Sequence, residues 1–152
     1  MPSAMRIVRQ CQGEFMRFKL IKQGFKSAVF NQSWQANTTG VRNDAKRLCE
    51  LAKQYDCLSI VDAVTSLGGI ELDVDGWGID AIYSGSQKCL SCVPGISPVS
   101  FSDRAVHVIQ NRKTKVQSWF LDMNLIVGYW GKGAKRDYHH TAPVNSMYAF
   151  YE

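Results

Sequence analysis

The stretch that decides the fold is Ile79-Asp80-Ala81-Ile82-Tyr83-Ser84-Gly85-Ser86-Gln87-Lys88. Residues 80–83 have the apolar character of a short buried strand, and small polar residues follow before a single lysine. In open α/β sheets, ligands bind at the carboxyl ends of the strands. A lysine that is shielded from water at such a place has a lowered pKa and can act as a nucleophile or form a Schiff base. We therefore expect Lys88 to be a reactive amine.

The residues before this stretch predict an α/β fold with a mainly parallel sheet. Residues 41–55 form a helix-like pattern, and its apolar positions are Val41, Ala45, Leu48, Leu51 and Ala52. Asp56 ends the helix, and an apolar strand follows over residues 57–61. A helix that leads directly into such a strand is half of a βαβ unit, which favours parallel strands.

Further elements are expected on both sides. Residues 14–22 fit either a strand or a helix, residues 28–30 fit a strand, and residues 37–40 are turn formers. Downstream we expect a strand over 96–101, a helix from its cap Ser102 to Asn111, a helix-like segment over 119–130 and a last helix capped by Asn145.

The composition predicts a globular protein with one core. The chain has 152 residues, of which 45% are hydrophobic and 20% charged. Its net charge is +5, but the basic residues are scattered, which does not favour nucleic-acid binding. No apolar run is long enough to span a bilayer. Five irregularly placed cysteines argue against a secreted disulfide framework. We expect an intracellular protein with no nucleic-acid or membrane partner.

Asp62 is the natural partner for Lys88, because each follows a predicted strand. Pyridoxal phosphate requires such a pair: the lysine holds its aldehyde, and the carboxylate keeps the pyridine nitrogen protonated. By spacing alone, an aspartate that caps a loop and a lysine on the surface are the preferred explanation, because an aspartate and a lysine 26 residues apart are common.

The sequence around both residues resembles the class V pyridoxal-phosphate aminotransferases. The resemblance rests on Val61-Asp62-Ala63-Val64-Thr65-Ser66-Leu67-Gly68-Gly69 and on Tyr83-Ser84-Gly85-Ser86-Gln87-Lys88. Tyr129-Trp130-Gly131 and Tyr138-His139-His140-Thr141 resemble the same family in the same order. Within it, the chain is most similar to the alanine–glyoxylate (serine–pyruvate) type, and the related 3-hydroxykynurenine transaminases are the alternative.

This resemblance implies a partial large domain of the aspartate-aminotransferase-like fold (fold type I) and assigns roles to single residues. Lys88 would form the Schiff base, Asp62 would pair with the pyridinium nitrogen, Val64 would pack on the ring and Gln87 would bind the phosphate. Tyr138 and Thr141 would reach the phosphate of a neighbouring subunit, which implies a homodimer. The substrates would be small amino acids and 2-oxo acids. The compartment would be the peroxisome, with the mitochondrion as the alternative.

The chain also departs from the family pattern. Asn37 stands where the family has a serine that contacts the cofactor, and residues 1–40 match poorly. Residues 41–152 correspond to part of the large domain that binds pyridoxal phosphate, and the small C-terminal domain is absent. The family's N-terminal phosphate-binding turn and its substrate-binding arginine have no counterpart here. The alternative function is therefore a catalytically silent fragment that dimerises or binds cofactor.

Cys89 and Cys92 form a C-x-x-C pattern directly after Lys88. Such a pattern is found in redox and zinc sites, and His139 and His140 could in principle complete a metal site. A second cysteine pair is missing, and the histidine spacing is not that of a zinc finger. We therefore favour small residues that pack behind the lysine loop, and we predict no metal site.

Overall fold

The computed structural model describes residues 18–22, 26–33, 42–130 and 138–152. For residues 18–22, 26–33 and 129–130 the description is of the backbone alone. Asn37, Val41 and the turn expected over 37–40 lie outside the described residues.

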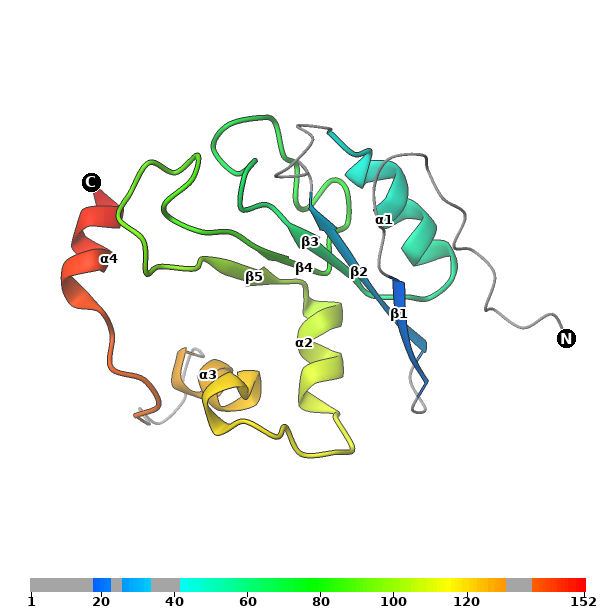
Figure 1. Cartoon of the computed structure of the whole chain (residues 1–152). Helices are drawn as coiled ribbons and strands as arrows, with labels where there is room; N and C mark the ends of the chain where they lie inside the picture. Colours follow the sequence, from blue (N-terminus) through cyan, green and yellow to red (C-terminus); the bar gives the residue numbers. More distant parts are fainter. Residues whose placement is uncertain (1–17, 23–25, 34–41, 131–137) are drawn as a thin grey trace, which may run out of the picture.

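The described strands form one mixed sheet in the order β1-β2-β3-β4-β5 (Figure 1). The strands are β1 (Phe18–Lys22), β2 (Lys26–Ser33), β3 (Ser59–Asp62), β4 (Ala81–Tyr83) and β5 (Val99–Phe101). The three central strands are parallel, as predicted, whereas both edge strands run antiparallel to their neighbours. The strand expected over 96–101 is shorter than predicted, because only Val99–Phe101 pair with β4.

Helix α1 (Ala45–Gln54) supplies the crossover between β2 and β3 and packs against both strands. It begins later than predicted, because the side chain of Asp44 accepts a hydrogen bond from the amide of Arg47 and so caps the helix. Its buried face contains Ala45 and Ala52, as predicted, and also Cys49, which the apolar pattern left out. A cysteine thiol is small enough to pack as an ordinary core side chain.

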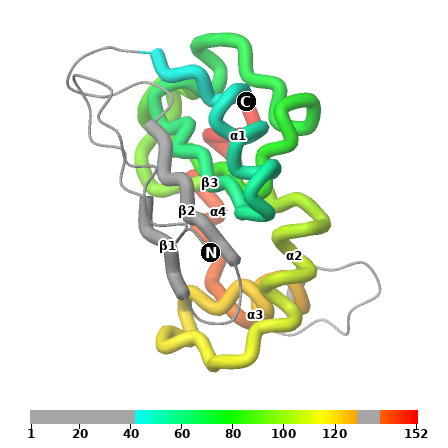
Figure 2. Tube along the Cα trace, turned by 90° about the vertical axis from the view of Figure 1, so that its right-hand side faces the viewer, coloured from blue at the N-terminus to red at the C-terminus, as the bar shows by residue number. Residues whose placement is uncertain are grey.

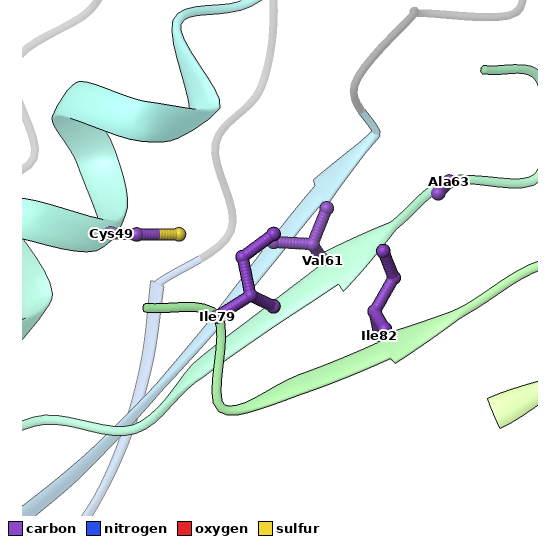
Figure 3. Close-up of a cluster of buried hydrophobic side chains, with 5 residues drawn as sticks. All are labelled: Cys49, Val61, Ala63, Ile79 and Ile82. Carbon is purple, nitrogen blue, oxygen red and sulfur yellow. The ribbon is translucent and has the colours of Figure 1, made fainter. Parts of the chain in front are cut away.

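The main core cluster lies where α1 meets the central strands. Cys49 points from α1 toward Val61 of β3 and Ile79 before β4, and Ala63 and Ile82 complete the cluster (Figure 3). Half-buried apolar side chains from the long β3–β4 connection pack against it: Leu67, Leu72, Val74 and Trp77. This connection makes the parallel crossover with turns instead of a helix.

In the described residues after β5, three further α-helices follow. Helix α2 (Asp103–Gln110) begins as predicted, because the hydroxyl of Ser102 accepts a hydrogen bond from the amide of Ala105. The segment expected as one helix over 119–130 is divided into a short 3-10 turn, Trp119–Leu121, and α3 (Met123–Trp130). Asp122 separates them, since its backbone is extended and its carboxylate accepts from the amide of Asn124. In Figures 1 and 2, α1 and α3 lie on opposite sides of the sheet.

The predicted cap of the last helix is wrong. Helix α4 (Val144–Tyr151) is preceded by Pro143, and Asn145 lies in its first turn. The carbonyl of Pro143 accepts the hydrogen bond from the amide of Met147, so the helix starts two residues before the position that Asn145 would have capped. Among the described residues, no helix is long and apolar enough to cross a membrane.

Asp80 joins the starts of β3, β4 and α2. Its carboxylate is buried and accepts hydrogen bonds from the amide of Ser59 at 2.9 Å, the hydroxyl of Ser102 at 3.0 Å and the guanidinium of Arg104 at 2.9 Å. Arg104 also donates to the carbonyl of Cys57 and to the exposed carboxylate of Asp56. A buried carboxylate is stable only when it is paired and fully hydrogen-bonded, and this one meets both conditions.

Replacement of Asp80 by alanine is expected to destabilise the fold by about 3 kcal/mol or more, because it leaves the buried donors without an acceptor. Urea unfolding followed by circular dichroism measures this loss. The matched control is Asp56→Asn, which removes the other negative charge bound by Arg104, on a side chain that is 83% exposed, and which suits the backbone φ of +52° at this position. Its cost should stay below about 1 kcal/mol. Equal losses in the two variants would contradict the central role of Asp80.

The buried thiol of Cys49 should make the stability of the fold fall at alkaline pH. Burial raises the pKa of its thiol above the ordinary value of 9.0; a hydrogen bond with Ser59 opposes this rise and the charge of Asp80 adds to it. The folded state therefore binds this proton more tightly than the unfolded chain does. The resulting stability is present below pH 9.0 and is lost as the pH rises through that value and beyond. Above it, the free energy of unfolding should fall more steeply for the wild type than for Cys49→Ala, and parallel curves would refute the assignment.

Candidate functional site

Asp62 ends β3 at the carboxyl edge of the sheet, where it is half-buried. One carboxylate oxygen accepts from the amide of Val64 at 3.0 Å, and the other accepts from the hydroxyl of Tyr83 at 2.8 Å. Asp62 and Tyr83 are direct partners in the parallel register of β3 and β4. The carboxylate is thus held from two sides, and each oxygen keeps a lone pair for a ligand.

The loop after β4 carries Gln87 and Lys88. Ser84, Gly85 and Ser86 are buried at its base, where the hydroxyl of Ser86 donates to the carbonyl of Val93 at 2.6 Å. The amide of Ser86 donates to the carbonyl of Ile96, which ties the loop to the segment before β5. The small polar residues between strand and lysine thus fasten the loop from below.

Lys88 itself is exposed, which corrects the expectation of a lysine shielded from water. The carbonyl of Lys88 accepts from the amide of Ser91, and this turn places both Gln87 and Lys88 at the surface of the described part of the chain. The described residues alone do not provide the apolar surroundings that we expected for Lys88.

The loops after β3 and β4 leave the same edge of the sheet and contact each other (Figure 1). The hydroxyl of Ser84 donates to the carbonyl of Ala63 at 3.0 Å. Further along, the thiol of Cys89 donates to the carbonyl of Thr65 at 3.2 Å. The fold therefore brings the predicted residues Asp62, Val64, Gln87 and Lys88 onto two neighbouring loops.

Tyr138 and Thr141 lie apart from these loops. Both are exposed, and their hydroxyls hydrogen-bond to each other. Between them, His139 is buried and stacks on Trp119, with ring centroids 4.1 Å apart. No interaction in the described ranges joins Tyr138 or Thr141 to Asp62 or Lys88. Their contribution to the site of a neighbouring subunit stays a prediction.

Two residues of the arrangement were not singled out by the sequence. Tyr83 orients Asp62, and Ser84 joins the two loops. Both stand in the stretch on which the resemblance rests, but their contacts depend on the register of β3 against β4. Asp62 and Tyr83 are the last residues of β3 and β4, so aligning the ends of the two predicted parallel strands would have paired them.

The donor set fits pyridoxal phosphate better than a metal ion. A carboxylate with spare lone pairs, an amide side chain and a primary amine are the groups that bind the ring nitrogen, the phosphate and the aldehyde. No group of three or more potential metal ligands comes together in the part of the chain that the structure describes. Cys89 and Cys92 are free thiols, and Cys89 engages a backbone carbonyl.

Comparison with known proteins places these residues in one family. A profile described as "Aminotransferase class-V" matches residues 17–152. The chain is 47% identical to the alanine–glyoxylate aminotransferase of Callithrix jacchus over 117 residues, which cover 76% of this chain and 28% of the relative. It is 44% identical to the same enzyme of Rattus norvegicus over 144 residues, 92% of this chain and 35% of the relative. The chain thus spans about a third of the length of these relatives.

Two solved aminotransferase structures have the same fold as this chain. The alanine–glyoxylate aminotransferase of Nostoc sp. superposes with a TM-score of 0.74 at 46% identity, over 80% of this chain and 32% of that one. The ureidoglycine–glyoxylate aminotransferase of Bacillus subtilis gives 0.73 at 33% identity, over 80% and 31%. The expected fold, a partial large domain of fold type I, is confirmed.

Loss of the hydroxyl of Tyr83 should weaken the fold at this edge. In Tyr83→Phe, the carboxylate of Asp62 loses one of its two donors, and we expect a destabilisation of about 1.5 kcal/mol, typical of a hydrogen bond to a charged group. Chemical denaturation measures the loss. Tyr55→Phe is the matched control, since Tyr55 is 56% exposed, and it should change stability by less than about 0.5 kcal/mol. Similar values for both variants would show that the bond to Asp62 contributes nothing.

Proposed function

The chain belongs to the class-V aminotransferase family, and from this we propose that it forms part of an enzyme that moves an amino group to glyoxylate with pyridoxal phosphate as cofactor. The observation that carries the proposal is the pair of adjoining loops that present Asp62 and Lys88 at one edge of the sheet. When bound, the cofactor supplies an electron sink that stabilises negative charge at the substrate α-carbon.

Asp62 is proposed to bind the pyridine nitrogen. The amide of Val64 and the hydroxyl of Tyr83 fix the plane of its carboxylate, so that little reorganisation is needed when the ring enters. The side chain of Val64 follows directly and is half-buried, which suits it to pack on the ring face. Asp62 thereby holds a proton on the ring nitrogen, which the electron sink requires.

Lys88 is proposed to be the residue whose amine would hold the aldehyde of the cofactor, and the same amine would carry the proton of the substrate α-carbon. Gln87 is the neighbouring donor for the phosphate. Exposure of both side chains in the described part of the chain leaves them accessible to a ligand. Tyr138 and Thr141 are proposed to donate to the phosphate of a second subunit in a homodimer, where two hydroxyls would make charge-assisted hydrogen bonds.

Glyoxylate is proposed as the amino acceptor because it is in the names of relatives with two different amino donors, alanine and (S)-ureidoglycine. Several are named alanine–glyoxylate aminotransferases, and a relative from Bacillus subtilis, 33% identical, is named (S)-ureidoglycine–glyoxylate transaminase. Alanine or serine is the proposed donor. The named alanine–glyoxylate enzymes favour this choice over 3-hydroxykynurenine, the alternative within the family.

Borohydride trapping tests the role of Lys88 without relying on turnover. Borohydride reduces a Schiff base to a stable secondary amine, so the cofactor should remain attached to the peptide that contains Lys88. Mass spectrometry of the digested protein locates it. The exposed Lys53 and Lys113 serve as internal controls and should stay unmodified.

Lys88→Arg keeps the positive charge but cannot form the Schiff base, so trapping and transamination from alanine to glyoxylate should both fall to background. Trapping on other lysines, or unchanged turnover in Lys88→Arg, would refute the assignment. Trapping at Lys88 without turnover of any of the proposed donors would instead support the silent, cofactor-binding alternative.

A further inference from the structure

We propose that Gly69 and Cys89 are a matched pair of positioning residues that set the spacing between the Asp62 loop (residues 62–69) and the Lys88 loop (residues 84–92). The inference rests on the proposed function, because it concerns where Lys88 stands relative to Asp62. It assigns a role to the glycine pair, Gly68 and Gly69, and to Cys89, the first cysteine of the C-x-x-C pattern.

The two loops come closest at Gly69. A Cβ atom on Gly69 would lie 2.8 Å from the thiol sulfur of Cys89 and 3.3 Å from its Cβ atom. The first distance is shorter than any real contact of this kind. Rotation of the thiol could relieve it only by giving up the hydrogen bond to Thr65, and rotation leaves the second contact unchanged. A side chain at position 69 therefore requires the thiol to leave Thr65 and the Lys88 loop to shift by a few tenths of an ångström.

Gly68 and Leu90, the residues next to Gly69 and Cys89, make a second close contact between the two loops. Gly68 has a φ of +84°, a backbone conformation that favours glycine, and a Cβ atom there would lie 3.2 Å from Leu90. Cys89 and Leu90 thus rest on Gly68 and Gly69, directly after the lysine.

Lys88 lies between two points of attachment. Before it, the hydroxyl of Ser84 binds the carbonyl of Ala63 at 3.0 Å. After it, the thiol of Cys89 binds the carbonyl of Thr65 at 3.2 Å and the glycine pair receives the loop. Because both acceptor carbonyls belong to the loop that begins with Asp62, the two attachments set where the backbone of Lys88 stands relative to Asp62. A displacement of about 1 Å in a reacting constellation can cost roughly a hundredfold in rate. The shift of a few tenths of an ångström that a side chain at position 69 requires should therefore cost a smaller factor.

The test is a double-mutant cycle read out by the rate at which pyridoxal phosphate becomes trappable on Lys88. Gly69→Ala should slow this rate about tenfold, within the range of coupling between residues in contact. Cys89→Ala removes the sulfur that the new methyl group meets, so Gly69→Ala should then cost less than about threefold. The matched control is Gly128→Ala, since a Cβ atom on Gly128 meets nothing within 4 Å. It should leave the trapping rate unchanged in both backgrounds.

A second measurement separates positioning from folding. The thermal midpoint of the cofactor-free variants, and their soluble yield, report on the contact even if no cofactor binds. Ala52→Gly, in the buried face of α1, lowers stability at a distance from the loops and should not slow trapping per folded molecule. If Gly69→Ala folds poorly, restoration of soluble protein by Cys89→Ala still supports the proposal.

Equal losses from Gly69→Ala in both cysteine backgrounds would overturn the inference, as would an unaltered trapping rate in Gly69→Ala. If the wild type shows no trapping on Lys88 at all, the proposed function fails. The thermal midpoints of Gly69→Ala, Cys89→Ala and the double variant then decide separately whether Gly69 and Cys89 depend on each other.

Discussion

The fold depends on one buried carboxylate and the groups that satisfy it. Asp80 stands just before β4, and its oxygens bind the start of β3, the cap of α2 and the guanidinium of Arg104. Its backbone takes part as well, since its amide donates to Ser59 and its carbonyl accepts from the amide of Ser102. One carboxylate thus ties β4 to β3 and α2, and a charge in this position is tolerated only while both elements stay in place.

This network lies at the amino ends of β3 and β4, and the candidate site lies at their carboxyl ends. The two aspartates show the division. Asp80 is buried and its carboxylate accepts from donors of two elements, β3 and α2, whereas Asp62 is half-buried and holds one protein donor on each oxygen. The first arrangement stabilises the sheet, and the second leaves capacity for a ligand. Stabilising contacts at one end of the sheet therefore leave the loops at the other end to present groups to a ligand.

The loops at the carboxyl end are built from small residues for a physical reason. Ser84, Gly85 and Ser86 fit into the buried base of the Lys88 loop, and Gly68 and Gly69 allow Cys89 and Leu90 to approach closely. Larger side chains would separate the two loops and, with them, the carboxylate and the amine. The same residues carry the resemblance to the family, so close packing of backbone accounts for part of what makes the signature recognisable.

The α/β class and the family followed from the sequence alone, because short-range patterns and the ordered signatures suffice for these. The same signatures proposed Asp62, Val64, Gln87 and Lys88, which the fold brings onto two neighbouring loops. The sequence also located the capping hydroxyl of Ser102, which acts within one turn of helix. Tertiary structure alone decided the antiparallel edge strands, the burial of Asp80 and Cys49, the bond from Tyr83 to Asp62 and the exposure of Lys88. Each of these features depends on the order of the strands in the sheet and on their register. The local pattern of a single segment encodes neither the order nor the register.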